Sequence, residues 1–305
     1  MHDRTSFYKY VSAEVAKIIL VNQTLRWSSP LLFDDPYDVT RVLAADIKIS
    51  EIQECLIDRI IYLVKNDVEL SLEMNPKLRF VLEHLRRSNR DDVKEKICQA
   101  MQDSKTELLK ESPGLDELRK MWKEMAPTFR ILCFSARNNI MSMWDRCADK
   151  FRGVVLEFSC LKEFDSPWLI AEPVRYEDRS SLLDKTGWGV LVTLNQSAAT
   201  KYIFNESCHT KTLAWSYQEE WRIVSFNRKG EKGEYSDYRF NPQELTAVYL
   251  GPEISVENKE IVIALLKHEL SHVKVYFGKT INGSCIEFSL VLDKNIKAKE
   301  GNVRV

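Results

Sequence analysis

The spacing of hydrophobic and polar positions changes along the chain. The segments that keep one regular spacing are shortest in the first 38 residues. Residues 7–10 and 25–28 have the composition of strands, and residues 13–20 between them carry apolar positions at helical spacing. Ser12 suits the N-cap of this helix, and Glu14 suits its first turn. We therefore predict a compact strand–helix–strand unit that closes at Ser29-Pro30.

The second region, residues 39–126, carries apolar positions at helical spacing, as at Ile52, Leu56, Ile60 and Leu63. It has no glycine before Gly114, and its basic and acidic residues are interleaved. These features predict an all-helical insertion of four or five helices. The sequence places breaks between them near residues 75–76, 88–90 and 112–114.

From Phe129 onward the pattern returns to that of strands. Strands are predicted at 129–134, 153–158, 174–176, 220–225, 245–250, 273–277 and 285–292, and helices at 198–208 and 255–270. This order predicts the α+β fold class, with a mixed or antiparallel sheet core interrupted by the helical insertion at 39–126. We expect residues 1–305 to form a single domain with that insertion.

Composition limits the classes of protein that the sequence can encode. The chain has 305 residues, seven scattered cysteines and a net charge of −1, which gives no strong electrostatic case for nucleic acid. Its longest apolar runs, at 60–64 and 261–266, are far shorter than the roughly 20 residues of a membrane span. The start lacks the pattern of a secretory signal. We expect a cytoplasmic protein with no membrane partner, which acts on an unknown protein or nucleic-acid target.

The small number of glycines and their positions exclude several nucleotide-binding motifs. The chain has only ten glycines, and because the first is Gly114 the first third cannot carry a P-loop or a Rossmann turn. The partial match at Gly187 and Gly189 lacks the third glycine of the dinucleotide fingerprint. No Gly-x-Ser-x-Gly elbow is present either.

Two clusters of carboxylates are candidates for chemistry. Asp34, Asp35 and Asp38 surround Pro36, either as a capped turn or as the polar rim of a pocket. Glu219 and Glu220 stand at the start of an otherwise apolar strand and are flanked by two tryptophans.

Two interpretations of Glu220 remain open. Arg222 lies two residues further on and therefore on the same strand face, which favours a structural ion pair. The alternative is an aromatic-walled cleft in which Glu220 binds a ribose hydroxyl or stabilises a cationic transition state.

A third candidate is the metal-binding pattern His268-Glu269-Leu270-Ser271-His272. A strand is predicted directly after it, so His272 falls at or beyond the end of the predicted helix and helical spacing is not assured. We predict no metal site here and keep a zinc-dependent hydrolase as the weakest of three readings.

A series of short motifs resembles a bacterial family of proteins with a domain of unknown function, the family numbered 2971. The motifs occur in the order FYKY at 7–10, LRWSSP at 25–30, FDDP at 33–36, CFS at 133–135, Met143-Trp144, GVVLEF at 153–158, Lys211 and WSYQEEWR at 215–222. The resemblance runs from Phe7 to about Gly251 and is interrupted by the helical insertion.

The opening unit is more distantly similar to the start of the ADP-ribosyltransferase fold. This resemblance implies NAD as a substrate. Lys9 would stand where those enzymes place His or Arg to hold the NAD, and Ser28 would stand at the hydroxyl position beside nicotinamide. Glu220 or Glu219 would be the catalytic glutamate. The further candidates for cofactor binding are the aromatic residues Tyr8, Tyr10, Trp27 and Trp215.

Three functions remain open on this basis. The first is an NAD-dependent ADP-ribosyltransferase-like enzyme, with an intracellular toxin or a phage-defence effector as its biological role. The second is a binding or sensor module on the same scaffold without catalysis. The third is the zinc-dependent hydrolase at His268 and His272.

Overall fold

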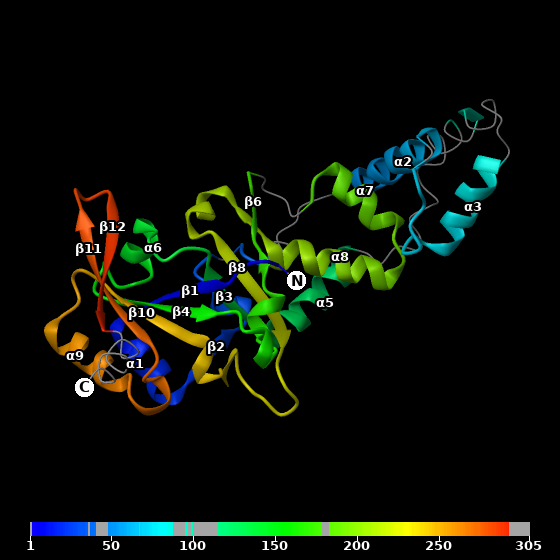
Figure 1. Cartoon of the computed structure of the whole chain (residues 1–305). Coiled ribbons are helices and arrows are strands. Elements are labelled where there is room, and N and C mark those ends of the chain that lie inside the picture. The colour runs from blue at the N-terminus through cyan, green and yellow to red at the C-terminus, as the bar shows by residue number, and fades with distance from the viewer. Residues whose placement is uncertain are drawn as a thin grey trace, which may run out of the picture. The chain divides into compact units, whose positions relative to one another are not determined.

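The structure is a computed structural model of the chain, and it describes residues 2–35, 37–40, 48–66, 68–87, 95–96, 99, 115–178 and 183–292. It divides into two compact units (Figure 1). The sheet unit consists of Met1–Phe33, Pro127–Glu177 and Lys211–Val305. The helical unit consists of Asp34–Ala126 and Asp178–Thr210.

A ten-stranded sheet forms the centre of the sheet unit in the described part of the chain. Its order is β12-β11-β10-β4-β1-β3-β2-β9, and β8 pairs with β3 and β5 outside this path. The pairing of β10 with β11 is parallel and the other pairings are antiparallel. The strands are β1 (Ser6–Val11), β2 (Thr24–Ser28), β3 (Phe129–Ser135), β4 (Val154–Ser159), β5 (Glu172–Pro173), β8 (Glu220–Phe226), β9 (Tyr235–Arg239), β10 (Leu245–Leu250), β11 (Lys274–Ile281) and β12 (Cys285–Leu292). The short strands β6 (Arg175–Glu177) and β7 (Thr210–Thr212) pair separately.

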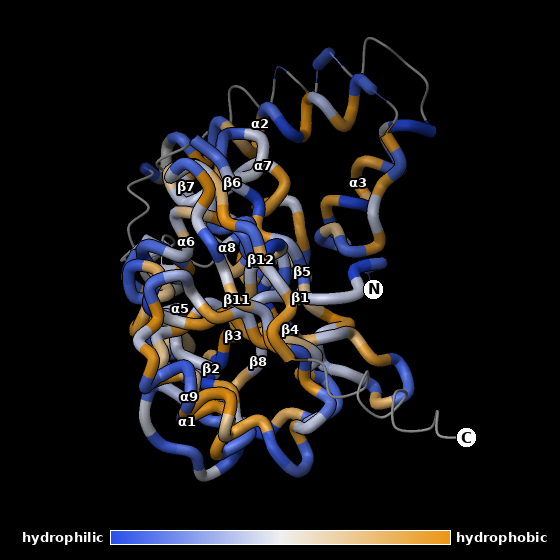
Figure 2. The backbone as a smooth tube through the Cα atoms, turned by 60° about the vertical axis from the view of Figure 1, so that its left-hand side comes forward, coloured by the Kyte–Doolittle hydropathy of each residue, from blue (hydrophilic) through white to orange (hydrophobic). Residues whose placement is uncertain are grey.

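Helices pack on both faces of this sheet. On one face α1 (Ala13–Asn22) and α9 (Val256–Leu265) contribute Ala16, Ile19 and Val262 to a core that includes Leu156 and Phe158. On the other face α6 (Met141–Arg146) contributes Trp144 to a cluster with Tyr10, Val155 and Tyr249. Because successive strand residues point to opposite faces, Val155 and Leu156 of β4 serve the two cores in turn. The central strands are accordingly largely apolar, which the orange colouring of β3 and β4 in Figure 2 shows.

The helical unit contains α2 (Ile49–Lys65), α3 (Pro76–Arg87) and α5 (Leu115–Met125) from its first segment, and α7 (Lys185–Thr193) and α8 (Gln196–His209) from its second. Its core includes Leu56, Ile60 and Leu63 of α2, three of the residues whose spacing predicted a helix. α2 and α7 approach closely at Gly189, where an added Cβ would lie 2.8 Å from the main-chain oxygen of Cys55. None of the described helices is long and apolar enough to cross a membrane.

The α+β class is confirmed, and the sheet is mostly antiparallel. The predicted strand–helix–strand start is present as β1, α1 and β2, and Ser12 accepts a hydrogen bond from the N–H of Val15 as an N-cap. The expected break at residues 75–76 is where α3 begins. The breaks expected at 88–90 and 112–114 lie outside the described residues.

Several features differ from the predictions, and the short elements α6, α7, β5 and β7 were not predicted. The helical unit takes in residues 178–210 besides the expected insertion at 39–126. Strand β9 was not predicted, because Asp237 and Arg239 give it a polar outer side. The helix predicted at 255–270 ends at Leu265, since the chain turns at Lys267 and passes through a positive φ of 52° at His268.

Candidate functional site

Glu220 begins β8 and lies beside the central strand β3. The register of the two strands pairs Ser135 with Glu220 and Cys133 with Arg222, so these four side chains share one face of the sheet. Glu219 ends the preceding 3₁₀ helix η6 (Leu213–Gln218) in a left-handed conformation, with φ of 44°. This turn directs the two neighbouring carboxylates to different surroundings.

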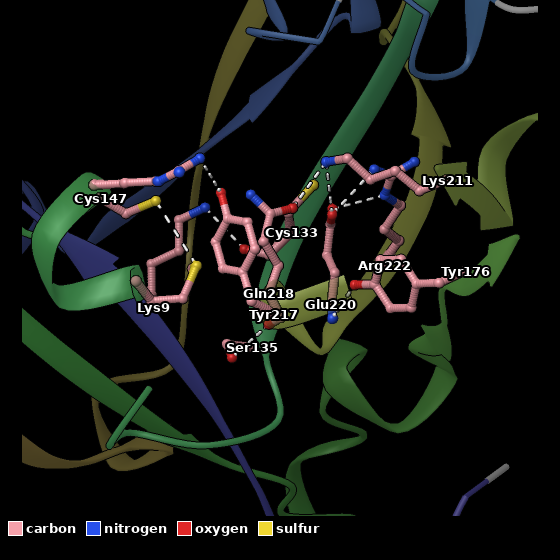
Figure 3. A network of polar contacts seen from close by, with 12 residues as sticks. Lys9, Cys133, Ser135, Cys147, Tyr176, Lys211, Tyr217, Gln218, Glu220 and Arg222 are labelled. Carbon is pink, nitrogen blue, oxygen red and sulfur yellow. Dashed lines mark hydrogen bonds and ion pairs between the residues drawn. The ribbon is translucent and has the colours of Figure 1, made fainter. Parts of the chain in front are cut away.

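Both oxygens of the Glu220 carboxylate are held by cations. Arg222 donates from Nε to Oε1 at 2.7 Å and from Nη2 to Oε2 at 3.2 Å, and Lys211 donates from Nζ to Oε2 at 3.2 Å (Figure 3). All three residues are buried. Burial raises the pKa of the Glu220 carboxyl, but attraction to Arg222 and then to Lys211 outweighs it and lowers the pKa to about 2. Glu220 is therefore anionic and tightly paired at neutral pH, and the predicted Arg222–Glu220 pair is confirmed.

The main chain of Glu220 is also fixed. Its N–H donates to the phenol oxygen of Tyr176 at 2.8 Å, and its carbonyl accepts from the N–H of Val174 at 2.9 Å. Strand β6 and the residue before it thus anchor the first residue of β8 and with it the charged cluster.

Cys133 connects Glu220 with Lys9. Its thiol lies beside the Glu220 carboxylate, and burial followed by this carboxylate raises its pKa to about 12. Lys9 on β1 donates from Nζ to the main-chain oxygen of Cys133 at 2.8 Å. Lys9 therefore reaches the position on β3 that is opposite Arg222, and it bonds to the backbone and not to the Glu220 carboxylate.

The turn η6 adds two aromatic rings, each with a cation over it. Lys211 lies 4.8 Å from the ring centroid of Trp215 and donates to Oε1 of Gln218 at 2.8 Å. The guanidinium of Arg146, which is exposed, lies 5.1 Å from the centroid of Tyr217. The two rings are 6.2 Å apart. The turn thus places one exposed guanidinium and two half-buried rings beside the buried Lys211.

The other predicted site residues lie around this cluster. Ser28 pairs with Ile131 of β3 and lies on the same face of the sheet as Glu220. Ile131 is four residues, or roughly 13 Å, along β3 from Ser135, the partner of Glu220. Tyr8 is the register partner of Ser135. Tyr10 donates to the carbonyl of Arg137 at 2.8 Å.

Trp27 and Glu219 point elsewhere. Trp27 is buried in the core on the opposite face, with its ring 5.7 Å from that of Tyr238. Glu219 pairs with Arg137 near the surface, and Arg137 Nε donates to Oε2 at 2.8 Å. The structure thus brings Lys9, Glu220 and Trp215 to one region and separates Trp27 and Glu219 from it.

The sequence did not indicate the roles of Lys211, Gln218 and Cys133. Lys211 occurs in the motif series without an assigned role, and its pairing with Glu220 depends on the turn η6. Cys133 lies in an apolar run, which gives no sign of a contact with a carboxylate. No local signal in the sequence indicates the pairing of Lys211 with Glu220, because the two residues are nine positions apart.

The two remaining motifs have structural explanations. Asp35 accepts from the N–H of Tyr37 at 3.0 Å through Oδ1, which confirms a capped turn; Pro36 lies outside the described residues. His268 and His272 lie around the 3₁₀ helix η8 (His268–Leu270), and Nε2 of His272 bonds to the carbonyl of Leu245 at 3.1 Å. The two imidazoles therefore lack the α-helical spacing that the zinc motif requires. Within the described residues, no group of three His, Cys, Asp or Glu side chains is placed to hold a metal ion.

Comparisons with known proteins gave no match: no family model fits the sequence, and no curated protein or solved structure is significantly similar to it.

Proposed function

We propose that the sheet unit is a ligand-binding module on an ADP-ribosyltransferase-like scaffold, and that its ligand is NAD or a closely related nucleotide. In this proposal Glu220 positions Lys211 and Arg222 and does not act on the reacting ribose. The observation that carries the proposal is the double pairing of the Glu220 carboxylate with these two cations.

The charge of the cluster supports binding over catalysis. An oxocarbenium-like centre needs an uncompensated negative charge beside it. Here one carboxylate faces two cations, and the exposed Arg146 adds a third positive charge nearby. The excess charge is therefore positive, which suits the pyrophosphate of a dinucleotide. The half-buried rings of Trp215 and Tyr217 provide stacking surfaces for its bases.

The enzyme reading remains the second candidate, because Lys9 and Glu220 both lie beside Cys133 on β3. Ser28 also pairs with β3, but roughly 13 Å along the strand from the level of Glu220. The two candidates predict different results for the same variant, Glu220→Gln.

Calorimetry with NAD and a nicotinamide-release assay test the proposal together. We expect the full chain to bind NAD, and Arg146→Met and Trp215→Ala to weaken binding on the order of tenfold each. Arg152→Met is the matched control, because Arg152 is also an exposed arginine close to α6 and pairs with Asp149. We expect it to bind NAD as the parent does.

Absence of NAD binding by the parent, or equal binding by the Arg146 and Arg152 variants, would contradict the proposal. Nicotinamide release that falls on the order of 10²- to 10³-fold in Glu220→Gln, in a protein that still folds, would establish the enzyme reading instead.

A further inference from the structure

A second charged group lies on the same face of the sheet. Tyr8 on β1 is the register partner of Glu157 on β4, and Glu157 is opposite Ala247, two residues before Tyr249 on β10. The phenol of Tyr249 donates to Oε2 of Glu157 at 2.6 Å. We call Tyr8, Glu157 and Tyr249 the phenol–carboxylate cluster.

The charge of Glu157 is not balanced in the way that the charge of Glu220 is. Among the described residues, no lysine, arginine or histidine forms an ion pair with Glu157, and its side-chain hydrogen bond comes from a neutral phenol. The side chain is partly buried, so water screens it incompletely. The negative charge of Glu157 also acts on Tyr8. Burial, and after it the charge of Glu157, raise the pKa of the Tyr8 phenol, while the charge of Arg4 lowers it.

Aromatic rings pack on and beside Tyr249, whose phenol binds this carboxylate. The rings of Tyr8 and Tyr249 are 6.3 Å apart at 67°, and Tyr276 stacks on Tyr249 at 4.9 Å and 12°. Phe288 meets Tyr249 edge-on at 4.8 Å. Tyr8, Tyr276 and Phe288 are each partly exposed, so a ligand can reach their rings. The faces of aromatic rings attract cations, most strongly where water is excluded.

We propose that the phenol–carboxylate cluster binds an organic cation, an alkylated ammonium group whose carbon atoms pack on the tyrosine rings while its charge faces Glu157. A metal ion is a poor fit, because one carboxylate and phenols supply too few charged oxygen ligands. The phenol–carboxylate cluster lies in the same row of register partners as Glu220, since Tyr8 is beside Ser135 and Ser135 is beside Glu220. The proposal for this cluster does not rest on NAD binding.

A calorimetric titration of the full chain with tetramethylammonium chloride tests this proposal. This probe has no N–H group, so its binding reports on the rings and the charge alone. We expect saturable binding that is weakened on the order of tenfold in Glu157→Gln and in Tyr8→Leu. Tyr8→Phe keeps the ring and should bind as the parent does. The neutral analogue tert-butanol should show no saturable binding, because it has the shape without the charge.

Glu253→Gln is the matched control, since Glu253 is an exposed glutamate in the same unit. Circular dichroism shows whether each variant is folded, and if Glu157→Gln is not, the comparison of Tyr8→Leu with Tyr8→Phe decides. The proposal is overturned if tetramethylammonium does not bind saturably to the parent, if folded Glu157→Gln binds it as tightly as Glu253→Gln does, or if Tyr8→Leu and Tyr8→Phe bind it equally.

Discussion

The phenol oxygen of Tyr176 accepts a hydrogen bond from the main-chain N–H of Glu220 at 2.8 Å. β8 begins at this residue, so the bond occupies a donor that the first residue of the strand would otherwise leave unpaired. A side chain from a separate segment thereby fixes the backbone from which the charged cluster projects.

Replacing Tyr176 with Phe should lower the free energy of unfolding by roughly 1 to 3 kcal/mol, because a buried N–H loses its acceptor. Denaturant melts measure this difference. Tyr217→Phe is a suitable comparison, since its phenol bonds to Arg146 at 3.3 Å in an exposed setting. Its effect should stay within about 0.5 kcal/mol. Equal losses in the two variants would show that the Tyr176 bond has no special role.

Glu220→Gln should be strongly destabilising. The change keeps the shape of the side chain but leaves Lys211 and Arg222 buried without their anion, and breaking a buried ion pair on one side costs about 3 kcal/mol or more. Asp237→Asn is the matched control, because Asp237 also binds an arginine through both oxygens, Arg26 at 3.0 Å and 3.0 Å, but in an exposed pair. We expect that loss to be below about 1 kcal/mol. A Glu220→Gln protein as stable as Asp237→Asn would contradict the structural role of the pair.

The free energy of unfolding should also depend on pH, because the ion pairs of Glu220 require its carboxylate to be charged. The folded-state pKa of Glu220 is lowered to about 2, below the ordinary value of 4.5. A carboxyl shifted downward stabilises the fold above its unfolded pKa and loses this contribution as the pH falls through the folded value. Stability of the parent should therefore fall between about pH 5 and pH 2. Glu231 contributes in the same direction, because hydrogen bonds from Ser236 and Tyr238 lower its pKa to about 2.

Denaturant melts of the parent and of Glu220→Gln between pH 5 and pH 2 separate the contribution of Glu220 from that of Glu231. The stability difference between parent and variant should shrink from pH 5 towards pH 2, whereas the slope due to Glu231 remains in both proteins. A difference that stays constant over this range would mean that Glu220 does not titrate as the cluster requires.

The thiol of Cys133 should resist alkylation in the folded protein. Burial and the Glu220 carboxylate raise its pKa to about 12, so very little thiolate is present at pH 8. Cys285 is exposed at the start of β12 and should react first with iodoacetamide. Mass spectrometry of the modified peptides measures the order of reaction. Early modification of Cys133 in folded protein would mean that its sulfur is neither buried nor beside a carboxylate.

The sequence predicts the local features of this fold well. The strands at 245–250 and 285–292 coincide with β10 and β12, and the two-residue period of a strand predicted the Arg222–Glu220 pair. The same period also explains Trp27: it alternates with Ser28, so only one of these two candidates can face the side of Glu220.

The features that the sequence does not predict depend on contacts between distant segments. The helical period of α7 and α8 does not say which unit they join, and their place in the helical unit rests on packing such as that of Gly189 against Cys55. Likewise, Lys211 becomes a partner of Glu220 only because η6 turns the chain back between them. Periodicity in a single chain carries no signal for either arrangement.

The long separation between β1 and its neighbours has a consequence for how the protein is made. Lys9 and Cys133, which bond at the centre of the sheet, are 124 residues apart. At the synthesis rate of about 5 to 20 residues per second, β1 leaves the ribosome roughly 6 to 25 s before its partner on β3 exists. During that interval both edges of β1 are open, and an open apolar edge can pair with other chains. Nascent β1 is therefore exposed to pairing with other chains until β3 and β4 arrive.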